Sequence, residues 1–201
     1  SGSIHPCLAP GARAAFPAHF SACPVAQRNL GEEIARGRVE LRTGDAMDCL
    51  LGARLSREYF DLIDIDGFGS GAPHNAEALG ALKVGGLLYL CCTDARTGAG
   101  RNAPPQALRA FGGLAASTPC SNELIARLVI ADAARQAAAR GLQLVPVFAF
   151  YHRPSSCARV MLRLAATGRK SPQVTSRVQP TRIVMLLRVN RSSTFRKGPG
   201  S

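Results

Sequence analysis

The sequence predicts an α/β protein built on an open, mostly parallel sheet. Segments with strand character alternate with segments with helix character along most of the chain, which is the order found in such sheets. The run from Leu87 to Thr93 is almost wholly apolar, as expected of a central strand that is buried on both faces. Hydrophobic residues make up 46% of the 201 residues, so the chain has enough apolar surface for one ordinary domain.

The individual elements follow from local patterns. A helix is predicted where apolar residues recur every three or four positions, and a strand where they alternate or run together. Asn122 is expected to cap the longest helix, and Gly141 to end it. The predicted helices cover residues 25–34, 76–82 and 122–140, and the predicted strands cover residues 38–42, 59–66, 87–93, 142–151 and 158–164. Residues 95–118 are predicted to form a long surface loop, and residues 181–190 one more strand or a helical turn.

Positive charge is concentrated at the carboxyl end of the chain. The net charge is +12, yet all 13 acidic residues lie between Glu32 and Asp132. This uneven distribution of charge predicts a polyanionic partner, and nucleic acid is the first candidate. A high-GC genome, which raises the content of Arg and Ala everywhere, is the alternative explanation, but it does not explain why acids are absent from one end. The predicted phosphate contacts are Arg169, Lys170, Arg177, Arg196 and Lys197.

Cysteine usage indicates free thiols. The seven cysteines are odd in number, and no CxxC or His/Cys pair has the spacing of a zinc site. We therefore predict no metal, and a reducing intracellular compartment, whether the nucleus, the cytoplasm or an organelle. No apolar run is long enough to span a membrane, so no membrane partner is expected.

Carboxylates follow three of the predicted strands. Asp45, Asp66 and Asp94 stand at or just beyond strand ends, where open α/β sheets bind their ligands. In the segment DIDGFGS, residues 64–70, Asp66 is followed by a glycine that permits a tight turn and then by Phe68. Methyl transfer to the exocyclic amine of a base requires an acceptor for the amine and a flat ring for stacking, which Asp66 and Phe68 supply. A simple turn at the end of a strand is the competing interpretation.

An ordered set of motifs resembles the tRNA guanine-26 N2-dimethyltransferase family. The segment FDLIDIDGFGSGAP, at residues 60–73, resembles that family's FDxIDxD strand followed by Asp-Pro-Phe/Tyr-Gly-Ser-Pro. The further matches, in order along the chain, are Gly-Asp-Ala at 44–46, LGALKVGGLL at 79–88, Thr-Asp at 93–94, CSNELIAR at 120–127, and Tyr151 followed by Arg159-Val160. The resemblance covers about residues 25–165.

The resemblance implies a fold, a cofactor and a partner. The fold is a Rossmann-like class I methyltransferase sheet, the cofactor is S-adenosyl-L-methionine, and the partner is tRNA or another structured RNA. Asp66 and Phe68 are the implied catalytic residues, and Asp45, Ala46 and Asp66 are the implied cofactor-binding residues. No metal is required, because the sulfonium group of the cofactor is already activated.

Other charged residues near these motifs have simpler interpretations. Asp61 and Asp64 are expected to be structural, and Asp94 is suited to capping the turn that follows it. Glu123 and Arg127 lie one helical turn apart. They form either an ion pair near the site or an ordinary exposed pair.

The sequence departs from the family's pattern in the motif loop and at the first strand. Gly67 and Gly71 replace prolines of the motif, which loosens the loop. The family holds its cofactor with a glycine-rich first strand and an acidic residue after the second strand, and neither is found upstream of Asn29. We therefore predict a sheet that lacks its first strand and has an exposed interior edge. Such an edge indicates a fragment, a degenerate paralogue or a sheet completed by a partner protein.

These observations divide the chain into three parts. They are a divergent segment at residues 1–30, a methyltransferase-like α/β domain at residues 31–166, and a basic linker and tail at residues 167–201. The predicted function is an S-adenosylmethionine-dependent tRNA guanine N2-methyltransferase, or a fragment of one. The alternative is a catalytically inactive RNA-binding or assembly protein on the same fold. A methyltransferase that acts on a substrate other than RNA is a third interpretation.

Overall fold

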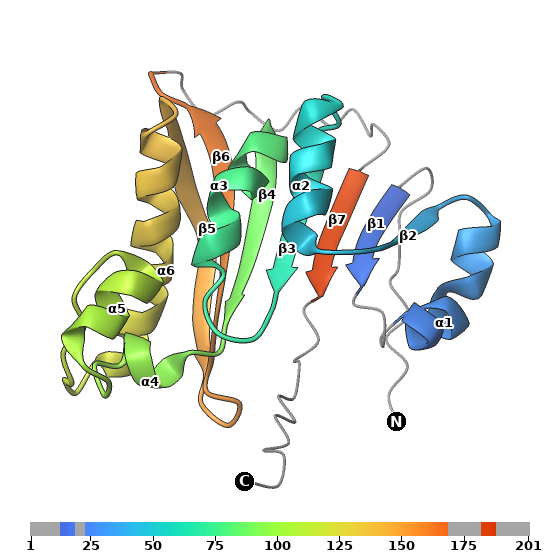
Figure 1. Cartoon of the computed structure of the whole chain (residues 1–201). Coiled ribbons are helices and arrows are strands. Elements are labelled where there is room, and N and C mark those ends of the chain that lie inside the picture. Colours follow the sequence, from blue (N-terminus) through green and yellow to red (C-terminus); the bar gives the residue numbers. More distant parts are fainter. Residues whose placement is uncertain (1–12, 19–22, 169–181, 188–201) are drawn as a thin grey trace, which may run out of the picture.

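The computed structural model describes residues 13–18, 23–168 and 182–187, which form one sheet with helices packed against it (Figure 1). The strands are β1 (Arg13–Ala18), β2 (Val39–Thr43), β3 (Phe60–Asp66), β4 (Leu82–Cys92), β5 (Leu142–His152), β6 (Cys157–Ala166) and β7 (Arg182–Leu187). The helices are α1 (Cys23–Ala35), α2 (Ala46–Leu55), α3 (Ala72–Ala81), α4 (Ala95–Gly98), α5 (Pro104–Phe111) and α6 (Ser121–Ala138).

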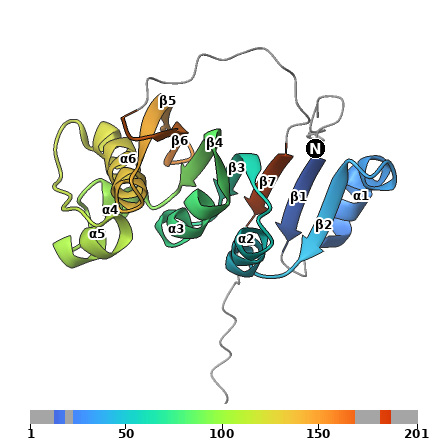
Figure 2. The same cartoon turned by 90° about the horizontal axis from the view of Figure 1, so that it is seen from above.

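The strands have the spatial order β2-β1-β7-β3-β4-β6-β5. Neighbouring strands from β2 to β4 pair in parallel, whereas β6 is antiparallel to both β4 and β5. Figure 2, seen from above, shows the strands as one row with α2 and α3 on the same side of it. This mostly parallel sheet confirms the predicted α/β class, and also the predicted pair of adjacent strands after the longest helix.

The central position of β7 differs from the sequence prediction. β7 lies between β1 and β3 and pairs in parallel with both, so that Val184 is opposite Ala15 on one side and Ile63 on the other. The prediction of an exposed interior edge is therefore wrong, because β7, from the far end of the same chain, fills the position between β1 and β3. The sheet also extends beyond residues 31–166 on both sides, since β1 and β7 lie outside that range.

One face of the central strands carries the hydrophobic core. Ile63, Ile65, Leu88, Leu90 and Leu162 are at most 2% exposed and belong to one buried cluster with residues of α3 and α6. Full burial of one such side chain contributes about 1.5–3 kcal/mol to stability. Because side chains alternate between the two faces of a strand, this pattern fixes the register of β3, β4 and β6.

The opposite face of the same strands is only partly covered. It carries Asp64, Tyr89 and Arg159, which are half-buried, and two aromatic rings of β5, Phe148 and Phe150, which are 40% and 46% exposed. The Tyr89 and Phe148 ring centroids are 6.0 Å apart, and those of Phe148 and Phe150 are 6.3 Å apart. The aromatic side chains therefore pack mainly against one another on this side of the sheet.

Local signals account for the elements that the sequence reading missed. The predicted loop at 95–118 is wrong, because it contains α4 and α5. Two prolines begin α5, where a proline costs no hydrogen bond, and Gly112 ends it with a left-handed φ of 57°. α2 begins after Asp45, whose side chain caps it, and β4 begins at Leu82, five residues earlier than predicted.

The longest helix has a different start from the one predicted. The cap position of α6 is Cys120, which makes no side-chain capping bond, so the expected role of Asn122 as the cap is wrong. The hydroxyl of Ser121 instead accepts from the Thr118 N–H and donates to the Thr118 carbonyl. No helix in the described part of the chain is long and apolar enough to cross a membrane.

The pairing of β7 predicts a large effect of proline in that strand. Val184→Pro removes an N–H from the middle of a central strand, so we expect the free energy of unfolding to fall by about 3 kcal/mol. Val184→Ile keeps the N–H and the β-branched shape, and it is the matched control. Urea unfolding of both variants measures the difference. Equal midpoints for the proline variant and the parent chain would contradict the placement of β7.

Candidate active site

The candidate site lies at the edge of the sheet where the parallel strands end. Asp45 follows β2, Asp66 ends β3 and Asp94 follows β4, and these three strands run in the same direction. Parallel strands place their carboxyl ends at one edge of a sheet, which is where ligands of such sheets bind. The fold thus brings the ends of β3 and β4 next to each other, with Asp66 opposite Cys91.

Asp66 has a cationic neighbour that sequence reasoning did not single out. Its side chain is 37% exposed, and its Oδ2 lies 3.7 Å from Nη2 of Arg159 on β6. The other terminal nitrogen of Arg159 donates to the Tyr89 hydroxyl at 3.1 Å, and the guanidinium lies 5.9 Å from the centroid of that ring. The hydrogen bond to Tyr89 raises the pKa of Arg159, so the cation persists beside Asp66. The signal for Arg159 was its place in the Arg-Val match of the paired strands.

A second carboxylate, Asp64, lies on the same face of β3 as Asp66. One of its oxygens is buried and has no hydrogen-bond partner among the described residues. Burial raises the pKa of Asp64 to about 6, the carboxylate of Asp66 adds to the rise, and Arg159 opposes it. Asp64 therefore titrates close to neutral pH although the sequence indicated only a structural role.

The loop that carries Phe68 is held at two points. The Gly69 N–H donates to the Thr93 hydroxyl at 2.8 Å, and the Thr93 N–H donates back to the Gly69 carbonyl at 2.9 Å. On the other side of the loop, the Ser70 hydroxyl donates to the Ala110 carbonyl of α5 at 3.0 Å. Gly69 has a φ of 88°, which a glycine adopts at little cost. The loop is thus anchored despite the loss of the motif's prolines.

Phe68 itself stands out from this anchored loop. Its side chain is 60% exposed, although it is a large apolar residue. An exposed ring beside a strand-end carboxylate is suited to stacking on an unpaired base. The structure therefore places both predicted catalytic residues, Asp66 and Phe68, at one sheet edge.

Of the predicted cofactor-binding residues, Ala46 lines a small cavity beside this loop, whereas Asp45 caps α2. The Asp45 carboxylate accepts from the Met47 N–H at 2.7 Å and so caps α2. Ala46, Gly67, Phe68 and His74 line a cavity of about 20 Å³. This volume holds about one water, so an adenine ring fits only when the cavity widens.

The remaining charged residues near the motifs have local roles. The Asp94 side chain accepts from the Thr97 N–H at 3.3 Å, so it caps α4 as expected. Glu123 and Arg127 form an exposed ion pair on α6, which is the ordinary i,i+4 interpretation. In the described ranges, no three His, Cys, Asp or Glu side chains are grouped to hold a metal ion. The predicted phosphate contacts lie outside the described residues: Arg169, Lys170, Arg177, Arg196 and Lys197.

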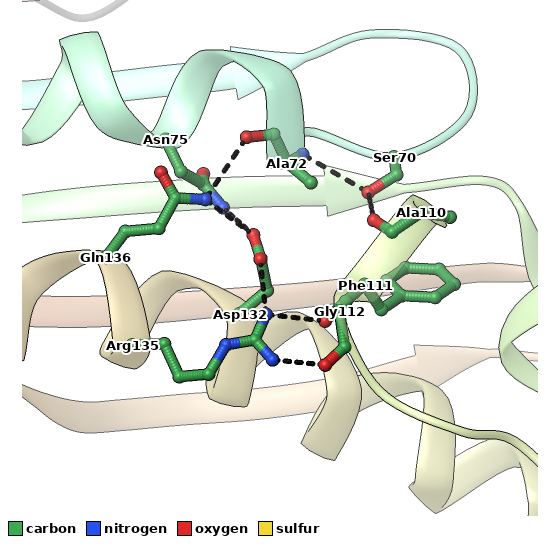
Figure 3. Close-up of polar contacts among 9 residues, drawn as sticks. All are labelled: Ser70, Ala72, Asn75, Ala110, Phe111, Gly112, Asp132, Arg135 and Gln136. Carbon is green, nitrogen blue, oxygen red and sulfur yellow. Dashed lines mark hydrogen bonds and ion pairs between the residues drawn. The ribbon is translucent and has the colours of Figure 1, made fainter. Parts of the chain in front are cut away.

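A larger cavity of about 780 Å³ lies beyond Phe68, between the motif loop, α5 and α6. Asp132 of α6 is 6% exposed and lies in its wall. Its carboxylate accepts from Asn75 at 2.8 Å, from Arg135 at 2.8 Å and from Gln136 at 3.1 Å (Figure 3). The sequence assigned no role to these polar residues, because the contact between Asn75 and Asp132 joins positions 57 residues apart.

The raised pKa of Asp64 predicts a stability that depends on pH. A carboxyl group with a folded-state pKa above its unfolded value of about 3.9 favours folding most when it is protonated. We therefore expect the chain to lose stability as the pH rises from about 4 to above 6. Asp64→Asn should remove this loss and stabilise the protein at pH 7 by about 1–2 kcal/mol, with little gain at pH 4.

The control for this experiment is Asp61→Asn on the same strand. Asp61 is paired with Lys83 at 2.9 Å, so its removal should not stabilise the protein at pH 7. Urea unfolding at pH 4 and pH 7 measures both variants. A gain that is the same at both pH values would show that Asp64 does not titrate in this range.

Comparison with known proteins places the chain beside tRNA-modifying enzymes. The tRNA (guanine(26)-N(2))-dimethyltransferase of Pyrobaculum aerophilum is 36% identical over 91 residues, which are 45% of this chain and 25% of that protein. The mouse (Mus musculus) enzyme of the same name is 33% identical over 92 residues, or 46% of this chain and 14% of that protein. The chain therefore matches about a quarter or less of the length of these two relatives.

One solved structure shares the fold. Trm1 from Pyrococcus horikoshii, solved in complex with S-adenosyl-L-methionine, superposes with a TM-score of 0.63 over 79% of this chain and 52% of that chain, at 19% sequence identity. At this identity the superposition establishes a shared fold and nothing further. The sequence model of the N2,N2-dimethylguanosine tRNA methyltransferases matches residues 19–191, which is most of the chain. The chain therefore belongs to the N2,N2-dimethylguanosine tRNA methyltransferase family.

Proposed function

We propose that this chain carries the methyl-transfer half of an S-adenosylmethionine-dependent tRNA guanine N2-methyltransferase. The observation that supports the proposal most is that Asp66 and the exposed ring of Phe68, two residues apart, lie at the carboxyl edge of a sheet of this family. The fold provides the edge, the loop provides a stacking surface, and the carboxylate provides an acceptor.

In this proposal, Asp66 orients the exocyclic amine of guanine. Its carboxylate accepts a hydrogen bond from the amine, which directs the nitrogen lone pair towards the methyl donor. Arg159, whose Nη2 lies 3.7 Å from Oδ2 of Asp66, forms an ion pair with Asp66 and limits the rotation of its side chain. Phe68 stacks on the base and holds it out of the RNA helix.

Bound S-adenosyl-L-methionine supplies a methyl group that is already activated by its sulfonium. Asp45 and Ala46 would hold the adenine end, with the Asp45 carboxylate as an acceptor and the Ala46 backbone as a further contact. Asp45 also begins α2, so its position is fixed by the helix that it caps. The proton released from the amine passes to Asp66 or to solvent.

The basic carboxyl-terminal segment would bind the phosphates of tRNA. Residues 133–201 contain no acidic residue, so positive charge there is not offset within the segment. Phosphate contacts of this kind supply affinity without reading sequence.

The alternative, an RNA-binding or assembly protein without methyl transfer, is not favoured by the family match, although the small cavity is compatible with it. The cavity beside Ala46 holds only about 20 Å³, and the described residues include no glycine-rich loop for the methionine part of the cofactor. A chain of this kind would bind tRNA but not the cofactor.

The role of Asp66 predicts a selective loss of catalysis. Asp66→Asn should lower methyl transfer to tRNA by about 10²–10⁴-fold, the usual contribution of an acid–base residue. Transfer of radiolabelled methyl to tRNA measures this, and calorimetry with S-adenosyl-L-methionine measures cofactor binding. Cofactor binding should be lost in Asp45→Ala, and calorimetry of Asp66→Asn separates an effect on cofactor binding from an effect on methyl transfer.

Asp61→Asn is the matched control, because it removes a carboxylate from the other end of the same strand. Full activity of Asp66→Asn would contradict the catalytic role of that residue. If the parent chain is folded and binds tRNA but neither binds the cofactor nor transfers methyl, the alternative function is supported.

The basic tail predicts a strong dependence of tRNA binding on salt. The double variant Arg196→Ala/Lys197→Ala removes two phosphate contacts, so the slope of log Kd against log salt should fall in magnitude by about 1–2. The control double variant, Arg57→Ala/Arg140→Ala, loses the same charge. These two arginines lie in turns that precede β3 and β5, at the sheet edge opposite the candidate site. Filter binding over a range of salt measures both. Identical slopes for the two double variants would show that the tail makes no specific contact.

A further inference from the structure

The large cavity beyond Phe68 has the size and lining of a ligand pocket. Its volume of about 780 Å³ lies within the range of about 300–1,000 Å³ usual for small-molecule sites. Phe68 forms one wall, and the segment of α4, α5 and their connection contributes Asn102, Gln106 and Arg109. Asp132 and Gln136 of α6 line it as well. Aromatic, amide and guanidinium groups therefore converge on one space.

The wall formed by α5 is fixed in place by side chains from two other elements. The last carbonyls of α5 and its cap are the acceptors: Ser70 donates to Ala110, and Arg135 donates to Phe111 at 2.9 Å and to Gly112 (Figure 3). Arg135 is in turn held by the buried Asp132. A Cβ at position 112 would collide with this guanidinium, which adds to the need for glycine there. The pocket is thus preformed rather than dependent on a ligand.

Two exposed polar side chains in this wall, Gln106 and Arg109, are available to a ligand. Asn102 donates to Thr97 at 2.8 Å, and the carboxylates of Asp94 and Asp132 already accept hydrogen bonds. Within the described ranges, by contrast, no group bonds the Gln106 amide or the Arg109 guanidinium. A guanidinium suits a phosphate, an amide suits a base edge, and Phe68 offers its ring for stacking. Together these groups match a nucleotide.

The methylated nucleotide itself does not account for this pocket. Its amine must lie within hydrogen-bond distance of Asp66, and Asp66 does not line the cavity. Ala46 lines the small cavity and not this one, and Phe68 lines both, so the larger cavity offers room for a second base beside Phe68.

We propose that this cavity binds the nucleotide that flanks the methylated one in the substrate RNA. Phe68 stacks on its base, Gln106 contacts the base edge and Arg109 contacts its phosphate. The inference rests on the proposed function for the identity of the ligand as RNA, but the pocket itself needs neither cofactor nor methyl transfer.

Binding of mononucleotides to the 201-residue chain tests this pocket. Ligand-observed NMR with adenosine and guanosine 5′-monophosphates should show saturation transfer to the base protons, whereas ribose 5-phosphate should bind more weakly. Phe68→Ala and Arg109→Ala should each weaken nucleotide binding about tenfold. Arg101→Ala removes an exposed arginine from the same segment that does not line the cavity, so it should leave binding unchanged.

Each contrary outcome overturns the proposal. Absence of mononucleotide binding, or an equal effect of Arg101→Ala and Arg109→Ala, would mean that no nucleotide site exists here. Equal binding of ribose 5-phosphate would mean a phosphate site only. A loss in Asp66→Asn as large as in Arg109→Ala would place the nucleotide at the methyl-transfer site.

The pocket and the proposed function fail in different ways. Nucleotide binding with this pattern in a chain that transfers no methyl group supports the pocket and contradicts the enzyme. Methyl transfer with unchanged kcat and KM in Arg109→Ala, together with no mononucleotide binding, supports the enzyme and contradicts the pocket.

Discussion

Parallel pairing of the central strands is the constraint on which the site depends. Asp45, Asp66 and Asp94 are far apart in the sequence, and they share one edge only because β2, β3 and β4 run in the same direction. β7 is essential to this arrangement. It is the only strand of the described sheet that pairs with both β1 and β3, so it joins the Asp45 side of the edge to the Asp66 side.

A second level of order comes from polar groups that are buried beside the edge. The Asp132 carboxylate accepts hydrogen bonds from side chains of α3 and α6. One of these donors, Arg135, also donates to the Phe111 carbonyl and so fixes the end of α5. The end of α5 in turn receives Ser70 from the loop that carries Phe68. Because a buried carboxylate without donors is costly, each of these bonds favours a single arrangement of helix and loop. The loop is thereby kept in position without the rigid prolines of the family's motif.

The sequence predicts those features that depend on neighbouring residues. The buried run of β4, the acids at strand ends and the length of α6 all follow from local periodicity, and the motif order points to Asp66 and Phe68. Features that depend on distant partners could not be predicted in this way. The placement of β7 follows from pairing with two strands over a hundred residues upstream, and the Arg159 contact with Asp66 follows from the register between β4 and β6. α4 and α5 were missed because glycine, proline and alanine suggested a loop, although the prolines begin α5 and Gly112 ends it.

The late position of β7 in the chain also has a consequence for the order of folding. Until residues 182–187 leave the ribosome, β1 and β2 have no backbone partner in the β3–β6 part of the sheet. During synthesis, the β1–β2 pair and the β3–β6 strands are therefore two separate, incomplete sheets, and each has one strand whose parallel partner is missing. Closing such a long loop is slow, and exposed edges are prone to pair with other chains. Folding yield should thus be governed by the time between the synthesis of β1 and the arrival of the strand that joins it to the rest.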